Sequence, residues 1–78
     1  MDYTYKTHYN DIVKVSEYHE MLVAQCKDSK QAVKIVNLIN DKYKNLNDNL
    51  KYRIIHELMK TISPEEKEKK INLLILES

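Results

Sequence analysis

The stretch from residue 45 to residue 66 constrains the fold of this chain more than any other. Its apolar residues recur at spacings of three and four, which lines one side of an α-helix with Leu50, Ile54, Ile55, Leu58, Met59 and Ile62. The sequence Ser63-Pro64-Glu65-Glu66 comes next and is typical of a new helix start, because serine can cap the first turn and proline fits its first position. We therefore expect two helices that meet at a sharp corner.

The preceding part of the chain fits two more helices. Residues 10–27 carry an apolar stripe at helical spacing, formed by Ile12, Val15, His19, Leu22 and Cys26. Asp28 followed by Gln31 predicts the cap of a second helix over 28–44, whose expected buried stripe is Ala32, Val33, Val36, Leu38, Ile39 and Tyr43. The connection between these two helices would be short, which predicts an antiparallel helical hairpin. Asn47 or Asp48 is the expected cap of the third helix.

Length and composition indicate one small folded domain. A chain of 78 residues has too little interior for two cores, and 42% hydrophobic residues with 32% charged residues are enough for folding. Without phenylalanine or tryptophan, such a core contributes only about 3 to 5 kcal/mol. We predict an all-α fold over residues 1–78, a three- to four-helix bundle with a short C-terminal helix, in which residues 1–9 form a flexible or extended arm.

The residues that could support chemistry do not fall at useful spacings. His56 lacks the second histidine, four residues later, of a zinc-protease motif, and His8 and His19 are too far apart to share a metal. Cys26 has no histidine within one helical turn, and phosphate-binding loops require glycine, which is absent. We expect His19 to be partly buried and Cys26 to be a buried core residue. The sequence therefore predicts no enzymatic activity, no catalytic or metal-binding residues, no cofactor and no small-molecule substrate.

The C-terminal segment has a surplus of large aliphatic residues. Five of the six residues from 71 to 76 are leucine or isoleucine, so they occupy more than one side of a helix. Other apolar residues lie beside the buried stripe of residues 10–27. We predict a protein-binding surface composed of Val13, Met21, Ile71, Leu73, Leu74, Ile75 and Leu76. It would contact a protein partner, or a second copy of the chain in a homodimer.

The predicted function is therefore that of a non-enzymatic interaction module, a small regulator or inhibitor. Glycine, alanine, arginine and proline are scarce, which favours an AT-rich coding sequence such as that of a phage or mobile element. Two alternatives are a helical immunity-type protein, which neutralises a toxin, and a DNA-binding transcriptional regulator. The regulator would use the helix starting near Asn47 and contact nucleic acid through Lys51, Tyr52 and Arg53.

Charge and hydropathy bear on partners and location. The net charge of +1 and the single arginine make nucleic acid an unfavoured partner, because phosphate neutralisation supplies much of that affinity. No apolar run approaches the roughly 18 residues of a membrane span, and the N-terminus lacks the apolar region of a signal peptide. We expect a cytoplasmic protein without a membrane partner, located in the host cytoplasm if a phage encodes it.

Overall fold

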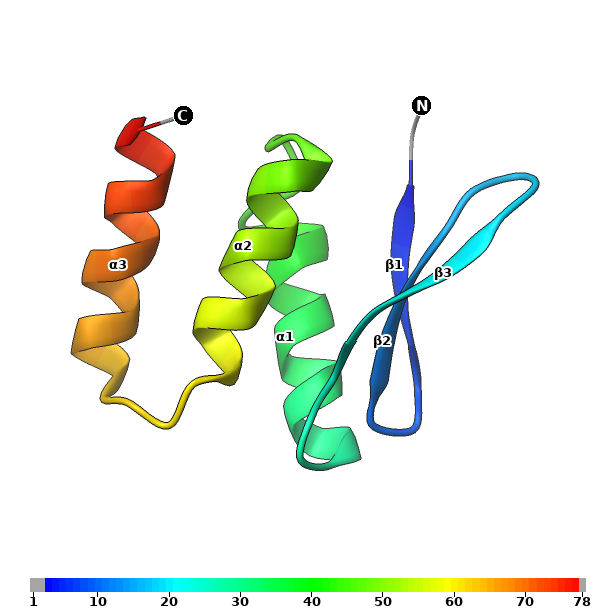
Figure 1. Ribbon diagram of the computed structural model, residues 1–78, viewed down its shortest axis with the longest axis horizontal. Coiled ribbons are helices and arrows are strands. Elements are labelled where there is room, and N and C mark those ends of the chain that lie inside the picture. Colours follow the sequence, from blue (N-terminus) through cyan, green and yellow to red (C-terminus); the bar gives the residue numbers. More distant parts are fainter. Residues whose placement is uncertain (1–2, 78) are drawn as a thin grey trace.

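The computed structural model describes residues 3–77 and shows a three-stranded sheet packed against three helices (Figure 1). The elements in chain order are β1 (Thr4–His8), β2 (Asp11–Val15), β3 (Glu20–Gln25), α1 (Ser29–Asp41), α2 (Asp48–Met59) and α3 (Pro64–Glu77). The fold is α+β, with the strands in the first third of the chain. The prediction of an all-α helical bundle is therefore wrong.

The error lies in residues 10–27, which were expected to form a helix and instead form β2, β3 and the turn between them. The segment is rich in β-branched residues, which pack well on a pleated strand. No glycine marks the turn. It is closed by Ser16, whose N–H donates to the His19 carbonyl (2.8 Å) and whose hydroxyl accepts from the His19 N–H (3.2 Å). His19 is consequently exposed, and the expected antiparallel hairpin of two helices does not exist.

The sheet is antiparallel with the order β1-β2-β3, so β1 and β3 are its edges. His8 pairs with Asp11, which leaves a turn of only two residues, Tyr9 and Asn10. Between β2 and β3 the register shifts after Ile12, so β3 contains one additional residue. Residues 4–8 of the expected N-terminal arm thus form a paired strand, and residues 1 and 2 lie outside the described residues.

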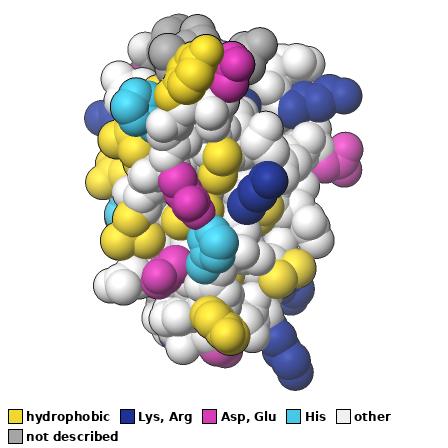
Figure 2. All heavy atoms as spheres, turned by 90° about the vertical axis from the view of Figure 1, so that its right-hand side faces the viewer, with side chains coloured by type: hydrophobic (Ala, Val, Ile, Leu, Met, Phe, Trp, Pro, Cys, Tyr) yellow, Lys and Arg dark blue, Asp and Glu magenta, His cyan; other side chains and the backbone are white. Residues whose placement is uncertain are grey.

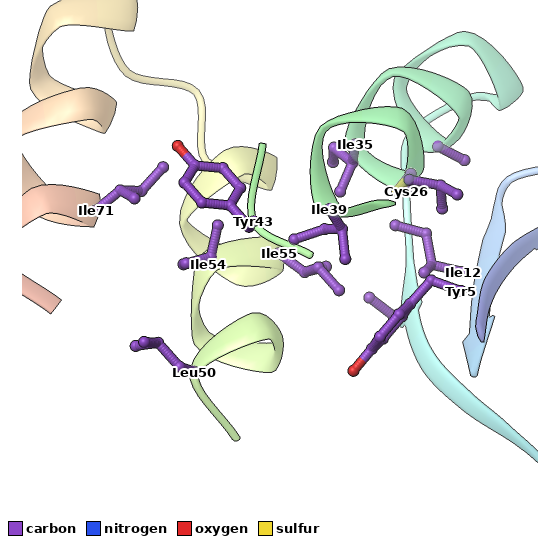
Figure 3. Close-up of a cluster of buried hydrophobic side chains, with 13 residues drawn as sticks. Tyr5, Ile12, Cys26, Ile35, Ile39, Tyr43, Leu50, Ile54, Ile55 and Ile71 are labelled. Carbon is purple, nitrogen blue, oxygen red and sulfur yellow. The ribbon is translucent and has the colours of Figure 1, made fainter. Parts of the chain in front are cut away.

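The hydrophobic core lies between one face of the sheet and the first two helices. Tyr5 and Ile12 of the sheet, Ile39 of α1 and Ile55 of α2 point toward one another (Figure 3). Helix α1 packs mainly on β1, α2 on α1, and α3 mainly on α2, so α3 lies farthest from the sheet (Figure 1). Ile71 is accordingly the single fully buried side chain that α3 supplies within the described residues.

All three helices begin where the sequence predicted. The Asp28 carboxylate accepts from the Gln31 N–H (2.8 Å), the Asn47 side chain accepts from the Leu50 N–H (2.8 Å), and the Ser63 hydroxyl accepts from the Glu66 N–H (3.2 Å). The expected buried stripe of α1 is partly wrong. Val33 and Leu38 are 45% and 39% exposed, because they lie beside the face that packs on the sheet. Among the described residues, no helix combines the length and the apolar character needed to cross a bilayer.

Candidate protein-binding groove

The seven residues predicted to form one protein-binding surface lie at separate places. Val13 and Ile71 are buried. Leu74 and Ile75 are half-buried and pack against the core, whereas Leu73 and Leu76 on α3 are 56% and 80% exposed. Met21 is also exposed, but on β3, at the opposite end of the molecule from α3 (Figure 1). The aliphatic surplus is real at Leu73 and Leu76, but these side chains do not form one surface with the exposed Met21 and Leu22 of β3.

The outer, sheet-side surface of the molecule offers no continuous apolar area. Figure 2 shows small separate hydrophobic patches on this side, interrupted by charged and polar side chains. The exposed His8 and Glu20 side chains, on β1 and β3, are joined by a hydrogen bond. Val13 is paired with Lys6 and Leu22 in the sheet and is buried, although it is not part of the core cluster.

The three residues of the nucleic-acid alternative do not share one face. Lys51, Tyr52 and Arg53 are consecutive on α2, so their side chains leave the helix about 100° apart. The Lys51 side chain packs inward, with its ammonium 5.5 Å from the centre of the Tyr5 ring. Tyr52 lies edge-on to His56, with the ring centres 4.4 Å apart. These side chains therefore do not form a continuous surface that could contact nucleic acid at the start of α2.

The candidate reactive residues are isolated from one another. Cys26 is buried as predicted, and burial raises the pKa of its thiol, with the charges of Asp28 and Asp11 adding to the effect. A raised pKa leaves less of the nucleophilic thiolate at neutral pH. His56 Nε2 is buried without a hydrogen-bond partner among the described residues. Within the same residues, no three His, Cys, Asp or Glu side chains gather into a metal site.

A groove that the sequence did not predict lies between α1 and the corner where α2 passes into α3. Its volume is about 980 Å³. Its apolar residues are Val33, Ile35, Leu38, Leu58 and Pro64. Its polar residues are Lys27, Asp28, Lys30, Gln31, Lys34 and Lys67. Figure 1 shows the start of α1 and the α2–α3 connection at the same end of the molecule.

The wall formed by the α2–α3 corner is fastened by a specific contact. The Lys67 ammonium donates to the Leu58 carbonyl (2.9 Å), which joins the first turn of α3 to the last turn of α2. A carbonyl at a helix end lacks an intrahelical partner, so a lysine is well suited to this position. With Ser63 capping α3, this contact holds Pro64 at the edge of the groove.

The wall formed by α1 is positively charged. Lys27, Lys30 and Lys34 make no ion pair with any described residue; among the described residues, the lysine that does so is Lys60, with Glu57. The one carboxylate of the groove, that of Asp28, is occupied in capping α1. Lys30 and Lys34 are one helical turn apart, so they form a cationic ridge along the apolar residues. Such a surface suits a partner segment that combines apolar side chains with carboxylates.

A signal for this groove was present in the sequence. The apolar residues of α1 cover a wider arc than one packed face requires, and lysines follow at steps of three and four on the adjoining side. Spacing alone predicts that Val33 and Leu38 are buried, because it does not show how much of this arc the rest of the chain covers. The opposite wall, contributed by residues 58–67, could not be read from local spacing.

Comparisons with protein-family models, with curated proteins and with solved structures each gave no match to this chain. A functional assignment therefore depends on the geometry of the chain itself.

Proposed function

We propose that this chain is a non-enzymatic protein-binding module, and that the groove between α1 and the α2–α3 corner binds an acidic amphipathic segment of another protein. One observation carries the proposal. Lysines without an anionic partner stand beside exposed aliphatic side chains that the monomer leaves uncovered. Apolar contact supplies affinity, while the cationic ridge selects acidic segments and rejects basic ones.

The size of the groove favours a weak and reversible complex. Stable complexes bury about 1,600 Å² in total, more than a groove bordered by one helix and one corner provides. An amphipathic helix would fit best, because its apolar residues at three- and four-residue spacing can contact Val33 and Leu38 while its carboxylates reach Lys30 and Lys34. The interaction should weaken as salt concentration rises, because exposed charge pairs are screened.

Two designed helical peptides test this function. They carry leucine at the same positions, but one has glutamate and the other lysine at the remaining positions. The acidic peptide should bind with saturable fluorescence anisotropy and shift the amide resonances of residues 27–38 and 58–67, and the basic peptide should not. In the Lys30→Glu, Lys34→Glu double variant, affinity for the acidic peptide should fall roughly tenfold, as expected for two exposed charge pairs of about 0.7 kcal/mol each.

The matched control is the Lys69→Glu, Lys70→Glu double variant. These lysines are exposed on α3 and do not line the groove, but their replacement changes the net charge by the same amount. Binding of the acidic peptide should be nearly unchanged in this control. Equal binding of the two peptides, or an equal loss in both double variants, would show that the groove does not select its partner.

A further inference from the structure

A second, polar hollow lies at the start of α2 and shares no residue with the groove. Its volume is about 500 Å³. It is lined by Tyr3, Lys44, Asn45, Leu46, Asn47, Asp48 and Lys51. The hollow is thus bordered by the chain before β1, by the connection between α1 and α2, and by the first turn of α2.

Lys51 is the unusual residue of this hollow. Its side chain is only 9% exposed, yet its ammonium makes no hydrogen bond or ion pair with any described residue. The ammonium itself is not fully buried, so its tip is open to the hollow while its stem is packed. The ammonium lies 5.5 Å from the centre of the Tyr5 ring and has no ion-pair partner among the described residues, so it can bind an anion that enters the hollow.

The start of α2 supplies further donors beside Lys51. Asn47 accepts the Leu50 N–H with its side chain and the Lys51 N–H with its carbonyl. The N–H groups of Asp48 and Asn49 are left without an acceptor among the described residues, at the positive end of the helix dipole. Lys44 is a second lysine in the lining. A helix start bordered by two lysines is a favourable place for an oxyanion.

Asp48 is the one group that opposes an anion in this hollow. One of its carboxylate oxygens accepts the Tyr5 hydroxyl (3.0 Å), which holds the side chain toward β1. The lining residues nevertheless include two lysines and one aspartate, and the Lys14 ammonium lies 4.5 Å from the centre of the neighbouring Tyr3 ring. The local balance therefore remains positive.

We propose that this hollow binds a phosphate group, held by the ammonium groups of Lys44 and Lys51 and by the free amides at the start of α2. The site is independent of the groove, because the two share no residue. The phosphate can be the free ion or part of a small phosphomonoester, and the chemistry of recognition is the same for both.

A titration with inorganic phosphate at constant ionic strength tests the site. The amide resonances of Asp48 and Asn49 and the side-chain signals of Lys51 should shift and saturate. Lys51→Met keeps the apolar stem and removes the charge, and it should weaken phosphate binding about tenfold, since a hydrogen bond to a charged group contributes about 1.5 kcal/mol or more. Lys44→Met should weaken binding by a smaller factor. A parallel titration with phenyl phosphate distinguishes the sources, because tighter binding identifies a monoester and equal binding identifies the free ion.

Asp48→Asn gives the sharpest result. The amide oxygen can still accept the Tyr5 hydroxyl, but the like charge is removed, so phosphate should bind several-fold more tightly. Lys34→Met is the matched control and should leave phosphate binding unchanged, since Lys34 lines the groove and not this hollow.

Three outcomes would overturn the site. They are non-saturating shifts spread over all lysines, unchanged phosphate binding in Lys51→Met, and weaker binding in Asp48→Asn. Circular dichroism establishes that each variant is folded. If Lys51→Met does not fold, Lys44→Met and Asp48→Asn decide the question without it.

Discussion

At the scale of single residues, Tyr5 connects the sheet to the helices more directly than any other polar side chain described. Its ring is buried in the core, its hydroxyl donates to Asp48 at the start of α2, and its carbonyl accepts from the Asn40 side chain of α1 (3.0 Å). Burial raises the pKa of the Tyr5 phenol, and the hydrogen bond to Asp48 and the negative charge of that residue raise it further. The residue therefore favours the native state only while it is protonated.

Stability should consequently fall at alkaline pH. The folded pKa of Tyr5 lies above the value of 10.0 for a free tyrosine, so the unfolded chain loses this proton first. The free energy of unfolding should be constant with respect to this group below pH 10 and decrease as pH rises above it. Urea denaturation of the wild type and of Tyr5→Phe between about pH 8 and pH 11 measures the effect. Tyr5→Phe should be less stable than the wild type at pH 8, and its free energy of unfolding should decrease less as pH rises. An equal decrease in both proteins would contradict a raised pKa at Tyr5.

Residue-level predictions from the sequence succeeded where the signal was local. Asp28, Asn47 and Ser63 cap helices because the N–H groups that they accept lie three residues along the chain. Cys26 is buried as expected. The prediction that His19 is partly buried was wrong because its surroundings depend on the β2–β3 turn, which contains no glycine or proline.

At the scale of elements, the sheet is the part of the fold that could not be predicted from the sequence. The apolar residues of 10–27 satisfy helical spacing, but they also include adjacent β-branched residues that suit a strand. The pairing of Ile12 with Ala24 joins residues twelve positions apart, and no local period encodes it. The β1–β2 turn was equally hidden, because Tyr9 adopts a φ of 58° there, in the region that glycine or asparagine normally occupies.

The Tyr9 turn gives a direct test of the hairpin. The Tyr9 side chain is 90% exposed, so it has few contacts to compensate for a strained backbone. Tyr9→Gly should raise the free energy of unfolding by about 1 kcal/mol, because a left-handed φ costs a non-glycine residue roughly that much. Thermal or urea denaturation measures the change.

Tyr18 provides the control for this substitution. It is also exposed and also lies in a turn, but its φ is not positive. Glycine at Tyr18 should therefore lower stability slightly, since it only adds freedom to the unfolded chain. If Tyr9→Gly is no more stable than Tyr18→Gly, Tyr9 does not have a positive φ in this turn.

At the scale of the whole molecule, the chain is a layered arrangement in which α3 is the outermost element (Figure 1). The helices were predictable from local signals, whereas the layers were not, because they depend on where the sheet lies. The groove has the same origin, since its walls come from residues 27–38 and 58–67. Spacing along the sequence identifies the apolar residues and lysines of the α1 wall, but it indicates neither the opposite wall nor the proximity of the two.

The position of α3 predicts unequal effects along its apolar side chains. Ile71→Ala should cost about 2 to 4 kcal/mol, because it leaves a cavity against α2. Leu73→Lys with Leu76→Lys should change stability by less than about 0.5 kcal/mol per site, because both side chains are exposed. Denaturation curves measure both effects.

If α3 also mediates the self-association proposed from the sequence, light scattering should show a lower mass for the lysine variant than for the wild type at high concentration.

Because separate segments frame the groove, it is absent from the denatured chain, and whatever occupies it must bind the native state alone. A ligand at a concentration one hundred times its dissociation constant then raises the free energy of unfolding by about 2.7 kcal/mol. That gain is similar to the whole stability available to so small a core, about 3 to 5 kcal/mol. In a cell, the abundance of intact chain would thus track the supply of its partner, with proteolysis removing the excess.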